Sequence, residues 1–264
     1  MSPQTELWFQ RWREVPDAAY RLICFPHAGG SASFFRPWQD HFPEAQVLAV
    51  RYPGRAERIE DPLAKDLRAL AQDIAAAVDD QGDQGDQQGL PLVFFGHSMG
   101  APIALETGRA LEAAGLPVAH LFASGSRDAP LPEPTPATDD EETVIEQLVA
   151  RGGTSREMLD DDLFRELVLP YILGDDQMFH SYRMSAEPLL NCPVTVLTGD
   201  QDEDADRRPW SSLTTRPVTQ VSVRGGHFYL TEEPPYELVR TALGLSDANT
   251  RTLRTPHSGP HESR

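Results

Sequence analysis

The sequence has few cysteines, few basic residues for its acidic content, and no long apolar run. Its two cysteines, Cys24 and Cys192, both lie in apolar stretches, which indicates two buried thiols rather than a disulfide framework or a metal site. Lysine and arginine number 23 against 41 aspartate and glutamate residues, and the formal net charge is −18. This imbalance argues against a nucleic-acid partner and against an anionic membrane surface, because both require cationic side chains.

Signals for export, for membrane insertion and for cofactors are also missing. The N-terminal residues lack the basic start and apolar centre of a signal peptide, and no apolar run approaches the roughly 20 residues that span a bilayer. The sequence contains no phosphate-binding loop of the Walker type, no dinucleotide-binding glycine pattern and no Cys/His cluster. We therefore expect a cytoplasmic protein without membrane contact, bound metal or cofactor.

The apolar pattern alternates between short runs and longer helical segments. Continuous apolar runs bounded by Gly, Pro or Asp are typical of parallel strands that are buried on both faces. Such runs cover residues 20–25, 46–52, 90–95, 118–124, 193–198 and 218–223. Helical spacing of apolar residues covers 63–78, 101–114 and 236–243. This alternation predicts an α/β fold with a mostly parallel central sheet and helices on both faces.

Other segments interrupt this alternation. A polar low-complexity stretch at 79–89 predicts an exposed loop. No strand pattern appears in 127–190, which begins proline-rich and continues with helical patterns at 142–150 and 160–184, so we expect a helical lid over a site. The predicted organisation is an N-terminal arm at 1–19 that packs on the body, an α/β core at 20–126 and 191–245, a helical lid at 127–190 and a disordered tail at 246–264.

The strongest chemical signal is the pattern Gly-x-Ser-x-Gly at residues 96–100. It follows a predicted strand directly and precedes a predicted helix directly, as in the nucleophile elbow of α/β-hydrolases. Such a turn presents the serine above the carboxyl edge of the sheet, beside the positive end of a helix. The context therefore predicts Ser98 as a catalytic nucleophile.

A serine needs a base, and in this fold the histidine comes late in the chain, after the acid. His227 lies in a glycine-containing loop between the last strand run and the final helix, and we predict it as the base. Weaker candidates lie in a strand run, in the lid or in the tail: His120, His180, His257 and His261. His27 precedes the serine, and His97 inside the elbow is predicted to be structural.

The remaining parts of an acyl-transfer site come from two loops. Four acids follow the strand run at 193–198, and composition does not choose among them: Asp200, Asp202, Glu203 and Asp204. One donor of the oxyanion hole is expected from the backbone N–H of Met99, directly after the nucleophile. The other is expected from the glycine-rich loop at 25–30.

Four motifs together resemble the type II thioesterases, free-standing hydrolases that accompany polyketide and nonribosomal peptide assembly lines. In chain order they are LICFPHAGGSASFFRPW, VRYPGRAER, FFGHSMGAPIALE and GGHFYL. The resemblance implies removal of acyl or aminoacyl groups from the phosphopantetheine arm of acyl or peptidyl carrier proteins, chiefly unproductive groups that stall the line. It also implies a triad of Ser98, His227 and an acid in the 200–202 loop, with oxyanion N–H groups from Ala28 and Met99.

Two positions depart from the family pattern. The helix after the elbow begins Gly-Ala at Ala101, where the family usually has Gly-Gly, and an added methyl there should be tolerable. Leu173 in LPYILGDDQ stands where relatives often have the arginine of a Leu-Pro-x-x-Arg-x-Asp pattern. The second difference concerns the substrate preference of the lid rather than the chemistry.

Among the acids we predict Asp202 as the triad member. Asp200 immediately follows Gly199 at the strand end, where its carboxylate is expected to stabilise the turn, whereas Asp202 lies further into the loop. The usual family spacing of Gly-x-x-Asp agrees. The alternatives to a thioesterase are a general carboxylesterase or lipase with the same triad, and a hydrolase-like binding protein without activity, against which the intact set of triad candidates argues.

Overall fold

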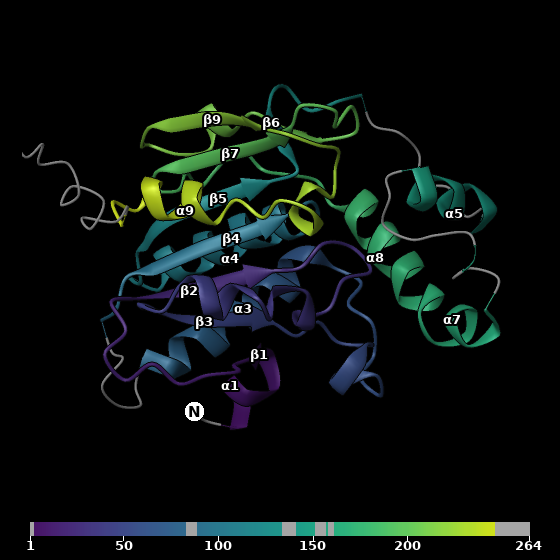
Figure 1. The fold of residues 1–264 in the computed structure, drawn as a ribbon, viewed down its shortest axis with the longest axis horizontal. Coiled ribbons are helices and arrows are strands. Elements are labelled where there is room, and N and C mark those ends of the chain that lie inside the picture. Colours follow the sequence, from purple (N-terminus) through teal and green to yellow (C-terminus); the bar gives the residue numbers. More distant parts are fainter. Residues whose placement is uncertain (1–2, 83–88, 134–140, 151–156, 158–160, 246–264) are drawn as a thin grey trace, which may run out of the picture.

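The computed structural model describes residues 3–82, 89–133, 141–150, 157 and 161–245, so the predicted tail at 246–264 lies outside the described residues (Figure 1). Within them, seven strands form a sheet in the order β1-β3-β2-β4-β5-β7-β9. The strands are β1 (Phe9–Gln10), β2 (Tyr20–Phe25), β3 (Ala45–Val50), β4 (Leu92–His97), β5 (Val118–Ser124), β7 (Val194–Gly199) and β9 (Val218–Val223). Every neighbouring pair is parallel except β1 with β3, which confirms the mostly parallel sheet.

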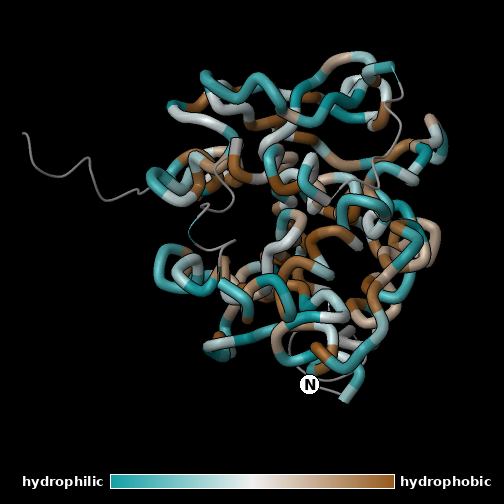
Figure 2. The backbone as a smooth tube through the Cα atoms, turned by 90° about the vertical axis from the view of Figure 1, so that its right-hand side faces the viewer, coloured by the Kyte–Doolittle hydropathy of each residue, from teal (hydrophilic) through white to brown (hydrophobic). Residues whose placement is uncertain are grey.

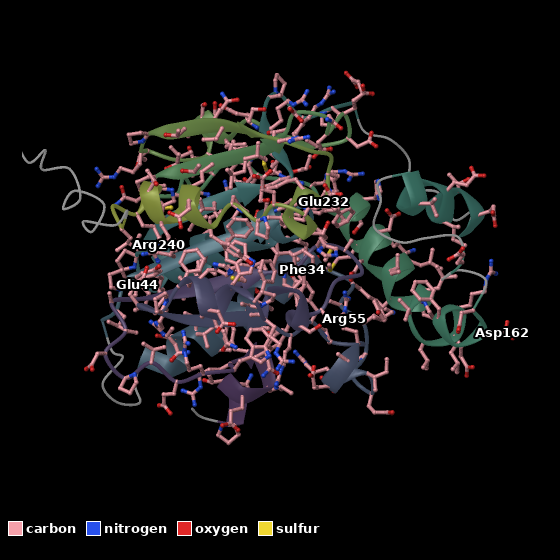
Figure 3. The ribbon with its side chains drawn as sticks, viewed as in Figure 1. Phe34, Glu44, Arg55, Asp162, Glu232 and Arg240 are labelled. Carbon is pink, nitrogen blue, oxygen red and sulfur yellow. The ribbon has the colours of Figure 1, made fainter. Side chains whose placement is uncertain are left out.

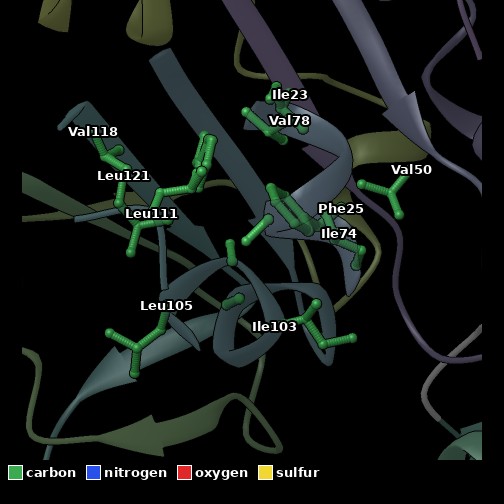
Figure 4. Packing of buried hydrophobic residues seen from close by; sticks show 14 of the residues in the cluster. Ile23, Phe25, Val50, Ile74, Val78, Ile103, Leu105, Leu111, Val118 and Leu121 are labelled. Carbon is green, nitrogen blue, oxygen red and sulfur yellow. The ribbon is translucent and has the colours of Figure 1, made fainter. Parts of the chain in front are cut away.

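Helices cover both faces of the sheet. One face packs on α3 (Leu67–Gly82) and α4 (Gly100–Ala113), the other on α2 (Trp38–His41) and α9 (Tyr236–Ala242). Successive side chains of β2 alternate between the two layers: Ile23 and Phe25 face the α3 side (Figure 4), and Leu22 and Cys24 face the α2 side. This double burial explains why the central strands appear as continuous apolar runs.

The N-terminal segment adds an element that the apolar pattern does not predict. Helix α1 (Pro3–Trp8) leads into β1, which pairs antiparallel with β3 at the edge of the sheet. Phe9 is fully buried there, and the N–H of Arg51 donates to the carbonyl of Trp8 at 2.8 Å. The segment expected as an arm therefore extends the central sheet by one strand, which was too short to show a periodic pattern.

The region between β5 and β7 is mainly helical, but it begins with a strand. Strand β6 (Ser126–Asp128) pairs in parallel with β8 (Asp206–Arg208) in a separate two-stranded sheet. The expectation that 127–190 contains no strand is thus wrong at its start, because three polar residues show no apolar alternation. Helices α5 (Glu141–Ala150), α7 (Asp162–Leu167) and α8 (Leu169–Ser181) follow and lie beyond one end of the sheet (Figure 1). A lid role for them stays a prediction.

Helix α3 and strand β9 also differ from the sequence prediction. Helix α3 begins four residues later than expected, because the Asp66 carboxylate accepts from the N–H of Ala69 at 2.8 Å and caps the helix. It also continues to Gly82, into the stretch that we expected to be loop. Strand β9 is not buried on both faces: Thr219 and Gln220 are exposed, because β9 is the outer strand of the sheet.

Apolar residues gather inside the molecule and polar ones outside it (Figure 2). Both cysteines are buried and unpaired, as the sequence predicts. None of the helices in the described ranges combines the length and the hydropathy that a bilayer crossing requires. The remaining short helices are η1 (Ala32–Phe35), η2 (Ala56–Arg58), η3 (Trp210–Ser212) and η4 (Tyr229–Thr231).

Candidate active site

Ser98 occupies a strained turn between β4 and α4. Its φ angle is 53°, in the left-handed region that non-glycine residues rarely adopt. The backbone N–H of Ser98 donates to the carbonyl of Ser124 at 2.8 Å, which ties the turn to the end of β5. The strand-turn-helix context predicted from the sequence is therefore present, and the serine side chain stands at the carboxyl end of the parallel strands.

Two glycines permit this turn because other backbone passes directly beside them. A Cβ atom on Gly96 would lie 2.3 Å from the carbonyl oxygen of Gly100. A Cβ atom on Gly100 would lie 2.1 Å from the carbonyl oxygen of Phe25, at the end of β2. Neither approach is sterically possible for a larger residue. The second contact also shows that the loop after β2 runs next to the elbow.

His227 reaches the serine from the loop between β9 and η4. Its Nε2 lies 2.9 Å from the Oγ of Ser98, and its ring is mostly buried. The Nδ1 atom lies 2.8 Å from Oδ2 of Asp202, which is 3% exposed. The structure thus joins Ser98, His227 and Asp202 in one hydrogen-bonded chain, although 129 residues separate the first two.

The acidic residues in the loop after β7 differ in their hydrogen-bond partners and in their exposure. Asp202 is held by its own backbone N–H, which donates to the carbonyl of Gly199 at 3.1 Å, and by the Arg127 guanidinium, which donates to the Asp202 carbonyl at 3.0 Å. Asp200 instead accepts from the N–H of Gly225 at 2.9 Å and joins the acidic loop to the histidine loop. Glu203 and Asp204 are exposed. Only Asp202 of the four contacts the imidazole.

The hydrogen bonds from Ser98 through His227 to Asp202 have the order of donors and acceptors that serine activation requires. When Nδ1–H of His227 donates to Asp202, Nε2 carries a lone pair and accepts the hydroxyl proton of Ser98. The buried carboxylate then faces the imidazolium that forms when the proton moves. The arrangement can therefore generate a serine alkoxide equivalent and return the proton to a leaving group.

Two other histidines lie beside the triad without joining it. His97 is fully buried, and its Nδ1 lies 2.8 Å from the Oγ of Ser124, which also pairs with the hydroxyl of Tyr229 at 2.7 Å. The ring of His27 packs edge-on against Phe228, with ring centres 4.9 Å apart. Burial lowers the pKa of His97 well below its ordinary value and that of His27 to about 3. Both rings are therefore neutral at pH 7.

The weaker histidine candidates lie away from the serine. The Nε2 of His120 lies 2.9 Å from the hydroxyl of Thr195, between two strands. His180 on α8 pairs with Asp176 one turn earlier on the same helix. His257 and His261 lie outside the described residues. The geometry therefore leaves His227 as the imidazole in contact with Ser98.

The two expected oxyanion donors belong to adjacent segments. Met99 follows Ser98 at the N-terminus of α4, and Ala28 lies in the loop after β2. This loop is held in place by hydrogen bonds from outside it: the Tyr52 hydroxyl donates to the carbonyl of Pro26 at 3.1 Å, and the N–H of Gly29 donates to a carboxylate oxygen of Asp175 at 2.8 Å. Both segments lie at the carboxyl end of the parallel sheet, where Ser98 lies.

Sequence reasoning missed the two charged residues behind this loop, Arg55 and Asp175. Arg55 lies in the motif VRYPGRAER and Asp175 in the segment LPYILGDDQ, but neither received a role. The sequence signal that could have found Asp175 was an acid among the apolar residues of a predicted helix. In the structure this side chain is buried on α8, with the residue 4% exposed. Buried charges are paired, so such a position predicts a partner.

A strained serine at a strand-to-helix turn, linked through a histidine to a buried acid above a mostly parallel sheet, defines an α/β-hydrolase. This confirms the fold class expected from the sequence.

The chain belongs to the thioesterase family: residues 20–243 match the family model described as a thioesterase domain. The chain is 36% identical over 233 residues to Thioesterase PikA5 of Streptomyces venezuelae, covering 86% of this chain and 81% of the relative. It is 37% identical over 235 residues to a probable cadicidin biosynthesis thioesterase of Streptomyces griseus, covering 85% of this chain but only 62% of that relative.

A solved structure gives the same result. The type II thioesterase BorB from the borrelidin biosynthetic cluster is similar with a TM-score of 0.74 and 35% identity, covering 90% of this chain and 98% of that chain. These findings confirm the family resemblance and the expected class of enzyme.

Proposed function

We propose that this enzyme hydrolyses acyl or aminoacyl thioesters on the phosphopantetheine arm of carrier proteins and thereby clears stalled or misprimed assembly lines. The observation that carries the proposal is the hydrogen-bonded chain from Ser98 through His227 to Asp202, at an elbow in a thioesterase-family fold. The names of the relatives support the pathway class, since one is a cadicidin biosynthesis thioesterase and another is from the borrelidin cluster. Acyl or peptidyl carrier proteins in the cytoplasm would be its partners.

The proposed reaction passes through an acyl-enzyme. His227 takes the hydroxyl proton of Ser98 as the Oγ attacks the thioester carbonyl, and the resulting oxyanion is bound by the N–H groups of Met99 and Ala28. His227 then protonates the departing pantetheine sulfur as the carbon–sulfur bond breaks. A water molecule, deprotonated by His227, attacks the acyl ester, and the released Ser98 oxygen recovers its proton while the free acid leaves. Asp202 orients and stabilises the imidazolium in both halves.

The same acyl group should be tested on two carriers of different size. The substrates are an acyl-carrier protein and the same acyl group on N-acetylcysteamine, with kcat/KM measured for each. We expect the carrier-bound thioester to be preferred, because the protein partner adds binding contacts that a short thiol lacks. Since the chain carries a net charge of −18 and would repel an acidic carrier over most of its surface, docking should depend on a local apolar or basic area.

The result separates the proposal from its two alternatives. A fluorophosphonate probe should label the wild type at Ser98 and leave Ser98→Ala unlabelled. Equal kcat/KM for both thioesters, with faster turnover of simple oxygen esters, would indicate a general carboxylesterase or lipase. Absence of both labelling and turnover would indicate a hydrolase-like binding protein.

A further inference from the structure

A bidentate ion pair lies behind the loop that carries Ala28. The two guanidinium nitrogens of Arg55 contact the two carboxylate oxygens of Asp175 at 2.5 and 2.6 Å. Both side chains are nearly inaccessible, 4% exposed for Arg55 and 6% for Asp175. The rings of Tyr52 and Tyr171 lie near the guanidinium, with its carbon 5.3 and 4.7 Å from the ring centres. The pair is therefore held in a single geometry.

Both members of the pair also bind the loop itself. The Oδ2 of Asp175 accepts the N–H of Gly29 at 2.8 Å. The Nη1 of Arg55 donates to the carbonyl of Gly30 at 3.2 Å. With the bond from Tyr52 to the carbonyl of Pro26, these contacts hold the loop on both sides of Ala28. The peptide between His27 and Ala28, which carries the N–H of Ala28, therefore lies between held peptides, and its own carbonyl accepts the N–H of Gly30 at 2.9 Å.

The ion pair joins three parts of the chain that are distant in sequence. Arg55 (labelled in Figure 3) follows β3, whereas Asp175 belongs to α8 and the loop follows β2. Burying such a pair costs desolvation free energy that apolar side chains would not cost, so stability alone is a weak reason for it. A fixed pair of charges does provide hydrogen bonds of defined direction to backbone groups.

We propose that Arg55 and Asp175 are positioning residues that orient the backbone N–H of Ala28 toward the oxyanion, acting through Gly29 and Gly30. This inference rests on the proposed function, in which that N–H group binds the tetrahedral intermediate. The contact between α8 and the loop, made by Asp175 and Gly29, would then help to determine the geometry of the oxyanion hole. The oxyanion develops in the transition state and is absent from the bound substrate, so the effect of the pair should appear in kcat rather than in substrate binding.

The test variant is Asp175→Asn. Asp175 accepts three N–H groups through its two oxygens, and in either orientation the NH₂ of an asparagine would face at least one of those donors. Removal of an oxyanion donor costs about 10²–10³ in kcat, so a displaced donor should cost roughly 10- to 100-fold. We expect this fall in kcat with KM changed by less than about twofold. Arg55→Lys, which keeps the charge but loses the bidentate contact, should fall between the wild type and Asp175→Asn.

Glu44→Gln is the matched control, because it makes the same chemical change in another ion pair. Glu44 contacts Arg240 at 2.7 Å, and Arg240 also donates to the carbonyl of His41, on the opposite side of the molecule from Arg55 (Figure 3). All variants are assayed below their unfolding midpoints with a p-nitrophenyl acyl ester, which reports on the serine without a carrier protein. A trifluoromethyl ketone should lose affinity for Asp175→Asn by the factor lost in kcat/KM, since it forms the same oxyanion.

Hydrogen–deuterium exchange supplies a readout that does not depend on turnover. The segment 26–30 should exchange faster in Asp175→Asn than in the wild type and in Glu44→Gln. Unchanged exchange there, or a kcat equal to that of the control, would overturn the positioning role. A wild type that cleaves the ester but not carrier-bound thioesters would instead refute the proposed substrate and leave this comparison valid. Absence of any esterase turnover would refute both.

Discussion

Exchanging the carboxylate of Asp202 for an amide should reverse the proton pattern of the triad. Asp202 Oδ2 lies 2.8 Å from Nδ1 of His227, and Nε2 lies 2.9 Å from Ser98 Oγ. In Asp202→Asn the amide NH₂ can donate to Nδ1, which places the imidazole proton on Nε2. His227 then donates to the serine instead of accepting its proton, and it is no longer a base at neutral pH.

The expected loss follows from that reversal. The equivalent change in a serine protease lowers kcat by about 10⁴, which corresponds to roughly 5.4 kcal/mol of transition-state stabilisation. The fold should survive, because the amide has nearly the same volume as the carboxylate in its buried position. We expect the unfolding midpoint to change by less than about 4 °C, equivalent to about 1 kcal/mol for a chain of this size.

Asp200→Asn is the internal control for this prediction. It makes the same change two residues earlier, on an exposed side chain that accepts the N–H of Gly225 and does not contact the imidazole. Its kcat should stay within about twofold of the wild type, and any cost should appear in stability, up to about 1 kcal/mol from the weakened hydrogen bond. The assay is thioester hydrolysis at neutral pH with thermal unfolding of both variants. Loss of activity in Asp200→Asn with retention in Asp202→Asn would refute the reasoning.

Three further predictions concern the nucleophile, the elbow and a buried imidazole. Ser98→Ala should lower kcat by about 10⁶ with an unchanged fold, and a variant that keeps a tenth of wild-type thioester hydrolysis would contradict the assignment. Gly100→Ala should lose about 3 kcal/mol of stability or more, because its Cβ would lie 2.1 Å from the carbonyl oxygen of Phe25. An unfolding midpoint equal to that of the wild type would be inconsistent with that contact. Burial lowers the pKa of His27 from its ordinary 6.5 to about 3. Between those values the unfolded chain binds a proton that the native state does not, so stability falls as pH drops below 6.5, by about 2 kcal/mol at pH 5. His27→Gln should reduce this loss in denaturant titrations at pH 7 and 5, and an identical loss in both proteins would argue against a neutral buried ring.

The central part of the fold was predictable because its signals are local. β2, β5 and β9 begin and end at the predicted residues, since Pro or Gly stands directly at one or both ends of each run. The elbow was predictable for a related reason: two glycines and a serine at fixed spacing between a strand and a helix permit few conformations. In these places the nearest neighbours in sequence determine the structure.

The elements that escaped prediction depend on distant partners. The two residues of β1 form a strand only because the edge of β3 offers hydrogen bonds, and β6 forms only beside β8. The contact between Arg55 and Asp175 spans 120 residues, and the sequence around each residue does not indicate its partner. The choice of Asp202 over its neighbours depends on its position further into the loop than Asp200 and on the agreeing family spacing, because composition does not distinguish four acids in one loop.

The short strand β1 has a consequence for handling the protein. Without it, β3 would become the outer strand of the sheet, and its end at Ala49 and Val50, which pairs with Gln10 and Phe9, would present unpaired backbone groups beside buried apolar side chains. Such an edge is a template for pairing with another chain and therefore for aggregation. Trp8 helps to hold the N-terminal segment in place, because the carbon of the Arg58 guanidinium lies 4.2 Å from the centre of its ring. An affinity tag or a truncation that displaces residues 3–10 should therefore promote aggregation, although these residues do not contact Ser98, His227 or Asp202.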